Sequence, residues 1–348
     1  MQFGVQYFPA VAPSEKSAKD YFAESLDIAV EAERRGFTHA RIVEHYFLPY
    51  GGYSPNPIVF LAALSQRTTS MRLVTGAVLP VFNNPLKLAG EIGMLDALSN
   101  GRLDVGMARA FLPHEFRHFK VDMNESIARY REGMEQIALL LEKENVTHHG
   151  QFHSFDNVTS LPRPTQLPRP KFYVAATQTP ETFEFAGREG HALMAIPISP
   201  KMRDLVALYR KAWRDAGHPG NGEVMMAFHM FCHEDTKLAR DIARKPFEAY
   251  FRMIAEVTGE FETTTRSGDY RDYDKMAAKL RATSLENQIA GGGAFIGAPD
   301  EMRDMILRAN ETFGPFDHAS LQINFATLPV NEARRSLNLF ADKVMSRL

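Results

Sequence analysis

Glu44 and His45 form an ionisable pair that closes the short, mostly apolar run Arg41-Ile42-Val43 and precedes a loop rich in glycine and proline. Because ionisable groups at the end of a buried strand lose hydration, such a pair needs a partner or a function. Histidine titrates near neutral pH and can transfer protons to a reacting group. We therefore expect His45 to be catalytic; the alternative is a strand-end histidine bonded to a backbone carbonyl. Glu44 should point to the opposite face and orient a neighbouring group or close an ion pair.

Two further segments could bind an anionic group. Arg109 follows a short strand that ends near Met107, and a guanidinium can hold a phosphate through two parallel hydrogen bonds. The segment 174–182 passes from a strand into a helix, with Thr179 at the N-cap position and Pro180 as the first helical residue. The amides and dipole at such a helix start favour a phosphate. The alternatives are a surface salt bridge and an ordinary helix cap.

Gly76 and Ala77 lie within an apolar strand that should be buried. Glycine at this place allows a flat ligand to approach the backbone closely, or an unusual backbone geometry. Simple tight packing is the alternative.

The elements that must position these residues alternate between strand and helix patterns. The periodicity predicts eight strands, each followed by a helix, at residues 2–8, 39–43, 72–79, 102–107, 172–176, 191–195, 224–232 and 319–325. This arrangement favours an α/β fold of the closed (β/α)8 barrel type, formed by one domain over residues 1–348. No G-x-G-x-x-G motif follows the first strand, which disfavours an open doubly wound sheet.

Two segments depart from this regularity. Residues 146–170 are polar and rich in proline, which predicts an excursion over the surface. Residues 258–293 are polar and end in three glycines. A long segment of that kind within a barrel is either disordered or a lid, and we favour a mobile lid.

Composition excludes several classes of function. The formal net charge is −2 and no long basic run is present, so we expect no nucleic-acid or membrane partner. No apolar stretch is long enough for a transmembrane helix, and the first residues lack a signal-peptide pattern, which predicts a soluble cytoplasmic protein. The single cysteine, Cys232, excludes an intramolecular disulfide. The histidines at 148–153 and 229–233 lack ligand spacing, so we expect no metal site.

An ordered set of motifs extends along nearly the whole chain. These motifs lie at residues 36–37 (GF), 44–47 (EHYF), 76–80 (GAVLP), 84–85 (NP), 95–103 (LDALSNGRL), 109 (R), 115–116 (EF), 180–182 (PET) and 297–301 (GAPDE). The set resembles the bacterial luciferase-like flavin-dependent monooxygenases. The resemblance implies a barrel that binds reduced FMN at the carboxyl ends of its strands. Oxygen reacts there to give a flavin hydroperoxide, which oxidises an organic substrate.

The resemblance also implies residue roles. His45 matches the catalytic histidine, and Gly76-Ala77 matches a strand that contacts the flavin face and often carries a cis peptide. The cofactor-binding positions for the phosphate end are Arg109, Ala176, Gln178, Thr179 and Thr182. Two departures are informative. Ala108 replaces the reactive cysteine of luciferases, so light emission is not expected. Asn83-Asn84 stands where many relatives have a histidine, which should alter contacts to substrate or to the flavin edge.

We therefore expect a monooxygenase that uses FMN (as FMNH2) and O2 to oxidise a small or medium apolar organic substrate. A separate flavin reductase should supply FMNH2, since no nicotinamide-binding motif is recognised. Relatives commonly pair through their first helices, which implies a homodimer. Two alternatives remain open: deazaflavin-dependent hydride transfer on the same fold, and a non-catalytic flavin-binding barrel.

Overall fold

Eight parallel strands close into a barrel in the computed structural model, which describes residues 1–198, 201–262, 270 and 274–348. The strands follow one another in the order β1-β2-β3-β4-β7-β8-β9-β11, and β11 pairs with β1. The predicted (β/α)8 barrel is confirmed. The barrel strands are β1 (Gln2–Tyr7), β2 (His39–Ile42), β3 (Arg72–Val78), β4 (Leu103–Met107), β7 (Lys171–Ala176), β8 (Ala192–Ala195), β9 (Val224–Cys232) and β11 (His318–Gln322).

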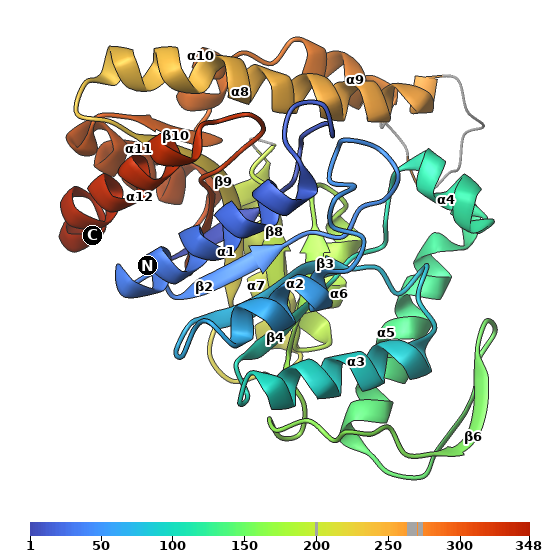
Figure 1. Cartoon of the computed structure of the whole chain (residues 1–348). Helices are drawn as coiled ribbons and strands as arrows, with labels where there is room; N and C mark the ends of the chain where they lie inside the picture. The colour runs from blue at the N-terminus through green and yellow to red at the C-terminus, as the bar shows by residue number, and fades with distance from the viewer. Residues whose placement is uncertain (199–200, 263–269, 271–273) are drawn as a thin grey trace.

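Helices surround this barrel (Figure 1). They are α1 (Ala18–Arg34), α2 (Pro57–Ser65), α3 (Pro85–Leu98), α4 (Pro113–Phe119), α5 (Ser126–Glu142), α6 (Pro180–Arg188), α7 (Met202–Asp215), α8 (Thr236–Thr258), α11 (Pro299–Phe313) and α12 (Val330–Lys343). In the described part of the chain, no helix has the length and apolar character needed to cross a bilayer.

Alternation along β1 shows how the two faces of a strand are used. Phe3 packs on Phe340 of α12 and Tyr7 on Phe60 of α2, with ring centroids 5.3 and 5.4 Å apart. These residues therefore face the helices. Because side chains alternate along a strand, the even-numbered residues of β1, Gln6 among them, face the barrel interior. Asn84 caps the start of α3, since its side chain accepts from the Leu86 amide, and Pro85 is the first helical residue.

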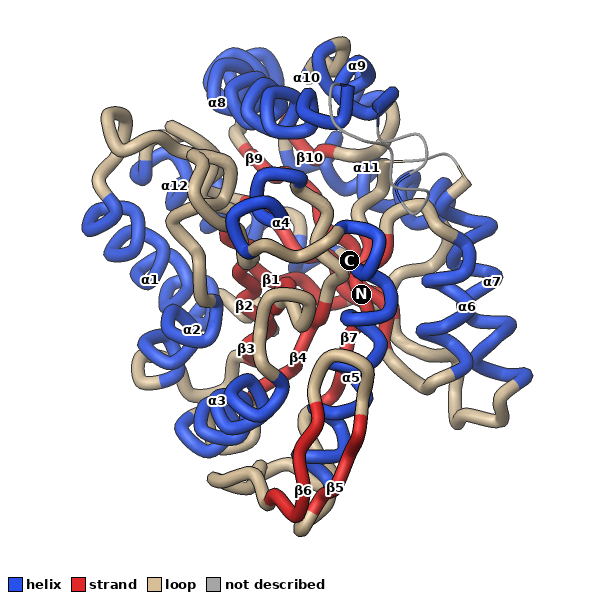
Figure 2. The backbone as a smooth tube through the Cα atoms, turned by 90° about the vertical axis from the view of Figure 1, so that its right-hand side faces the viewer, coloured by secondary structure: helices blue, strands red, loops and turns tan. Residues whose placement is uncertain are grey.

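The predicted excursion at residues 146–170 contains a two-stranded hairpin that was not predicted from the sequence. Strands β5 (Val146–His149) and β6 (Ser154–Val158) pair in antiparallel fashion and project from the body of the protein (Figure 2). The chain then crosses α3 closely. A Cβ on Gly93 would lie 2.2 Å from the Pro162 carbonyl oxygen, and the Gln166 amides donate to Asp96.

The segment predicted as a lid is more regular than expected where it is described. It contains a 3-10 turn (Gly259–Glu262), α9 (Asp274–Arg281) and α10 (Leu285–Ala290). Helices α9 and α10 pack against α8 (Figure 1). A short strand that was not predicted, β10 (Ala294–Gly297), follows and pairs with the end of β9. The remainder of the predicted lid, at 263–269 and 271–273, lies outside the described residues.

Candidate active site

Four neighbouring strands of the barrel carry the predicted site residues. Strands β2, β3, β4 and β7 are consecutive in the barrel. His45 follows β2, Gly76 and Ala77 lie near the end of β3, Arg109 follows β4, and Thr179 follows β7. Because parallel barrel strands end at a common rim, these residues share the carboxyl-terminal rim, where barrel enzymes place their active sites.

His45 is held by a buried carboxylate. Glu115 of α4 is completely buried, and its Oε1 lies 3.0 Å from Nδ1 of His45. The same oxygen accepts from the Tyr46 amide at 3.0 Å. When ionised, Glu115 favours the tautomer with a proton on Nδ1, which leaves Nε2 of His45 for another partner. Glu115 belongs to one of the motifs in the sequence, but nothing local to residue 115 indicates a contact with residue 45, so its role could not be predicted.

Aromatic rings surround the His45 imidazole. The ring centroids of Phe8, Tyr50 and Phe111 lie 5.4, 5.3 and 6.0 Å from that of His45. Tyr250 of α8 packs on Phe8 at 5.3 Å. The His45 side chain is 11% exposed. The histidine is therefore fixed in orientation within an apolar, water-poor surrounding.

Glu44 points away from His45 and connects two rim loops. Its carboxylate accepts hydrogen bonds from the Leu79 amide (3.2 Å), the Asn83 side chain (3.1 Å) and the Tyr46 hydroxyl. Burial raises the pKa of Glu44 to about 7, against the lowering effect of these hydrogen bonds. Glu44 thus orients Tyr46 and Asn83 rather than contacting the imidazole.

The Gly76-Ala77 peptide bond is cis, in the strand where the family resemblance places such a bond. The Gly76 carbonyl accepts from Nη2 of Arg41 at 3.2 Å. A Cβ on Gly76 would lie 2.2 Å from Nε of Arg41, so close packing alone requires glycine here. Gly76 is therefore tightly packed against the Arg41 side chain, as the alternative interpretation of this glycine expects. Contact of the Gly76-Ala77 peptide with flavin stays a prediction.

Arg109 lies partly buried above a tyrosine ring. Its guanidinium carbon is 4.3 Å from the ring centroid of Tyr270, and the Tyr270 hydroxyl donates to the Ala110 carbonyl at 3.1 Å. Such a cation–π contact orients the guanidinium while leaving its charge in place.

Thr179 occupies the N-cap position of α6, as predicted, but its hydroxyl makes no capping hydrogen bond. Thr179 and Thr182 are partly buried, Gln178 is exposed and Ala176 is buried. The first turn of α6 therefore has no side-chain cap of its own. A cationic Arg109 after β4 and this helix start after the adjacent strand β7 fit a phosphate group.

The described part of the chain contains no group of three His, Cys, Asp or Glu side chains arranged to hold a metal ion. His229, one of the histidines considered from the sequence, is buried among Phe247, Tyr250 and Phe325. Burial lowers the pKa of His229 to about 3, so this side chain is neutral.

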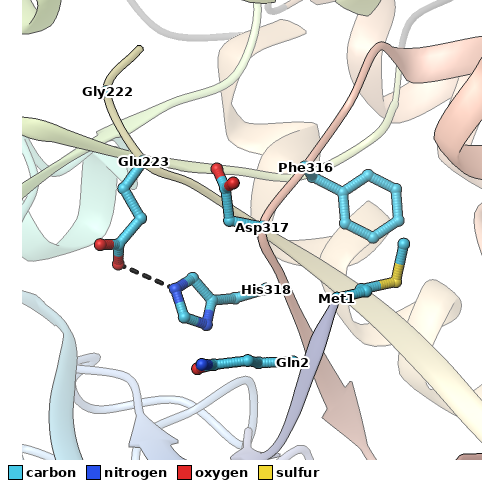
Figure 3. Close-up of a pocket in the computed structure, with 7 residues that line it drawn as sticks. All are labelled: Met1, Gln2, Gly222, Glu223, Phe316, Asp317 and His318. Atoms are coloured by element: carbon cyan, nitrogen blue, oxygen red, sulfur yellow. Dashed lines mark ion pairs between the residues drawn. The ribbon is translucent and has the colours of Figure 1, made fainter. Parts of the chain in front are cut away.

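A polar hollow of about 390 Å³ lies at the opposite end of the barrel, and its lining residues are drawn in Figure 3. Glu223, Asp317 and His318 line it, at the amino ends of β9 and β11. Glu223 pairs with His318 at 2.9 Å and with Lys171 at 2.6 Å. Burial would raise the pKa of Glu223, yet hydrogen bonds from His318, Lys171 and Tyr173 hold it well below its usual range. Residues at this end of a barrel serve stability rather than catalysis.

Comparison with known proteins identifies the family of this chain. A family model described as luciferase-like monooxygenase matches residues 1–314. The oxygenase component of flavin-dependent trigonelline monooxygenase from Acinetobacter baylyi is 30% identical over 268 residues, which cover 74% of each chain. The crystal structure of monooxygenase RslO1 from Streptomyces bottropensis is 42% identical, covers 99% of both chains and superposes with a TM-score of 0.88.

Two more distant structures share the fold alone. The oxygenating constituent of 3,6-diketocamphane monooxygenase from Pseudomonas putida, in complex with FMN, is 20% identical with a TM-score of 0.83 and covers 100% of this chain and 99% of its own. An F420-dependent secondary alcohol dehydrogenase is 17% identical with a TM-score of 0.75 and covers 99% of this chain and 98% of its own. Taken with the closed barrel and the full-length matches, the family model shows that this chain belongs to the luciferase-like monooxygenases.

Proposed function

We propose that the protein is an oxygenase component that uses FMNH2 and O2 to insert one oxygen atom into an organic substrate. The observation that supports this proposal is the common rim: the His45–Glu115 pair, Arg109 and the uncapped start of α6 come after strands β2, β4 and β7 of one barrel. The relative from Acinetobacter is named an oxygenase component, which supports delivery of FMNH2 by a separate reductase.

The proposed role of each residue follows from its position at the rim. Arg109 and the hydroxyls of Thr179 and Thr182 would hold the phosphate of FMN, and the Gly76-Ala77 peptide would contact its ring system. Bound reduced flavin supplies the two electrons with which O2 gives one oxygen atom to the substrate and one to water. Nε2 of His45 moves a proton at the oxygen that reacts, and Glu115 stabilises the imidazolium when it forms.

The walls around His45 support a substrate with an apolar body. Phe8, Tyr50 and Phe111 surround the imidazole, and Tyr250 adds a ring to the same cluster. These rings exclude water from the site. Water exclusion prevents the electrons of the flavin from being lost as hydrogen peroxide.

Deazaflavin-dependent hydride transfer is the second candidate, favoured by the fold shared with an F420-dependent dehydrogenase. Its cofactor also carries a phosphate, so Arg109 and α6 suit both candidates. Oxygen separates them: a hydride-transfer enzyme turns over reduced deazaflavin anaerobically, whereas the proposed oxygenase requires O2 and FMNH2.

Rapid mixing of FMNH2-loaded protein with O2 tests the proposal. We expect bound flavin to reoxidise at a rate different from that of free FMNH2, and H2O2 release to fall when an accepted substrate is added. Reoxidation at the free-flavin rate, with one H2O2 per flavin under all conditions, would refute it. Anaerobic reduction of oxidised F420 by a secondary alcohol would establish the second candidate instead.

We also propose a homodimer, on the evidence of apolar side chains exposed along α2 and α3. Val59, Met94 and Leu98 are 67%, 57% and 44% exposed. Light scattering should give twice the chain mass of 39.2 kDa. Replacement of Met94 by Glu should give the monomer mass, and a wild-type monomer would contradict the proposal.

A further inference from the structure

Four polar side chains form a row across the barrel interior. His229 of β9 is in register with Gln322 of β11, Gln322 with Gln6 of β1, and Gln6 with Arg41 of β2. All four are buried. Each has a side-chain nitrogen or oxygen that lacks a hydrogen-bond partner among the described residues. Buried polar groups normally have partners, so this row is a candidate for a function.

Arg41 carries the row's unbalanced charge. Its side chain donates to the Gly76 carbonyl through Nη2, while Nε and Nη1 have no acceptor in the described part of the chain. Arg41 is 5% exposed, and none of the ion pairs between described residues includes it. Burial lowers its pKa to about 10, which leaves the guanidinium charged at neutral pH. A buried charge without an ionic partner destabilises the fold, so it calls for a compensating role.

The ionisable groups near Arg41 do not neutralise it. Tyr250 of α8 interacts with its charge, and burial raises the pKa of Tyr250 to about 12, so the phenol is uncharged. His39 lies two residues earlier on β2, and its pKa is well below its ordinary value. Burial is the main cause of this lowering, and the charges of His318 and Arg41 lower the pKa further. His229 is neutral for the same reason of burial. The interior therefore has a fixed positive charge at neutral pH.

The position of the Arg41 charge indicates which bound molecule it interacts with. Nε and Nη1 are sealed from solvent, so a substrate that exchanges through the rim does not reach them. Arg41 is, however, hydrogen-bonded to the peptide against which the flavin ring is proposed to lie. Reduced flavin at neutral pH is an anion, with its charge on the N1–C2 carbonyl edge, whereas oxidised flavin is neutral in the ring. A charge in a medium of low dielectric acts over several ångströms without contact.

We propose that Arg41 makes the site selective for reduced over oxidised FMN, by stabilising the anionic ring electrostatically. The inference rests on the proposed function, because it takes FMN as the cofactor. It explains how an oxygenase that receives FMNH2 from another protein would retain the reduced form and release the oxidised one. Arg41 acts on the ring from beneath the Gly76 peptide and is not a catalytic residue.

Anaerobic titrations of wild-type protein and Arg41→Met with FMNH2 and with FMN test this selectivity. The dissociation constant of FMN divided by that of FMNH2 measures the selectivity for the reduced form, and this ratio should fall by roughly tenfold or more in Arg41→Met. A thermodynamic cycle converts each factor of ten to about 30 mV in the midpoint potential of the bound flavin. Gln6→Met is the matched control, because it removes a neutral polar group from the same row. Its ratio should stay within about threefold of the wild-type ratio. Arg41→Met also removes the hydrogen bond to the Gly76 carbonyl. This loss affects the binding of FMN and FMNH2 alike, so a change in the ratio reports the effect of the charge.

An unchanged ratio in folded Arg41→Met would overturn the inference, as would an equal fall in Gln6→Met. If Arg41→Met does not fold, the N1 pKa of reduced FMN bound to wild-type protein decides. It should lie below that of free FMNH2 in the same buffer, and an equal or higher pKa would refute the inference. Protein that binds neither form of FMN would instead refute the proposed function. Protein that oxygenates with an unaltered ratio would refute this inference alone.

Discussion

Glu115 Oε1 lies 3.0 Å from Nδ1 of His45, although the two residues are 70 positions apart in the chain. The contact joins α4 to the loop after β2 and fixes which imidazole nitrogen faces away from the carboxylate. A histidine held in this way keeps one tautomer and one orientation. A carboxylate–imidazole pair of this kind is a common way to prepare a histidine for proton transfer.

The His45–Glu115 pair should behave as a unit. His45→Ala should lower product formation from an accepted substrate by roughly 10²–10⁴-fold, the range for a general acid–base group. Glu115→Gln keeps the shape but removes the charge, and we expect a smaller loss. The double variant should be no slower than His45→Ala, because the carboxylate acts through the imidazole. If the rate loss of the double variant equalled the product of the two single losses, the two residues would act separately.

Arg109→Ala should weaken FMN binding far more than riboflavin binding. Hydrogen bonds to charged groups contribute about 1.5–3 kcal/mol, which corresponds to roughly ten- to hundred-fold in affinity. Riboflavin lacks the phosphate, so its affinity should be unaltered. Fluorescence titration with both ligands measures the two constants. An equal loss for both ligands would place Arg109 at the ring rather than at the phosphate.

Thr179→Ala separates ligand binding from helix capping. Because the Thr179 hydroxyl makes no capping bond, its loss should leave the melting temperature unchanged. FMN affinity should fall several-fold while riboflavin affinity stays constant. Calorimetry and titration on the same preparation test both points. A lower melting temperature with constant FMN affinity would identify an ordinary cap.

Glu44 should make stability decrease as the pH rises. Its folded pKa of about 7 lies above its ordinary value of 4.5, so the native state binds the extra proton between these values. The stabilisation is complete below pH 4.5 and is lost as the pH rises through 7, by roughly 3 kcal/mol. Glu44→Gln should lack this decrease. Urea unfolding at several pH values gives the difference between the two proteins, and parallel profiles would contradict the prediction.

Gly76→Ala should destabilise the protein, since the new Cβ would lie 2.2 Å from Nε of Arg41. Overpacking of this kind costs about 1–3 kcal/mol. Gly90→Ala in α3 is the matched control, because the nearest atom to its Cβ, the Leu161 carbonyl oxygen, is 3.6 Å away. Alanine there should be neutral or slightly stabilising, as in other helices. Thermal unfolding compares the two variants, and equal midpoints would show that Arg41 moves aside freely.

The barrel could be predicted because its strands are short apolar runs with helices of clear periodicity between them. The β3 run around Val74 and the helix start at Asn84-Pro85 are examples where local pattern and tertiary structure agree. Strand β10 was missed because its four residues follow directly after three glycines at the end of the predicted lid. The hairpin β5–β6 was missed because its polar residues do not alternate with apolar ones.

The candidate site could be predicted only where function coincides with a strand end. His45, Arg109 and Thr179 each follow a strand, so the fold itself brings them to one rim. The roles proposed for Glu115 and Arg41 depend on contacts between elements that are distant in the sequence. Arg41 in particular belongs to a run that was interpreted as mostly apolar, and only the register with Gln6 shows that it faces the interior.

A crystal structure of the protein with FMN would test the central claim most directly. The account predicts the phosphate between the Arg109 guanidinium and the first turn of α6, with the isoalloxazine ring against Gly76-Ala77 and its edge near Nε2 of His45. Flavin bound elsewhere, for example in the polar hollow beside Glu223 and His318, or with its phosphate away from Arg109 and Thr179, would contradict it.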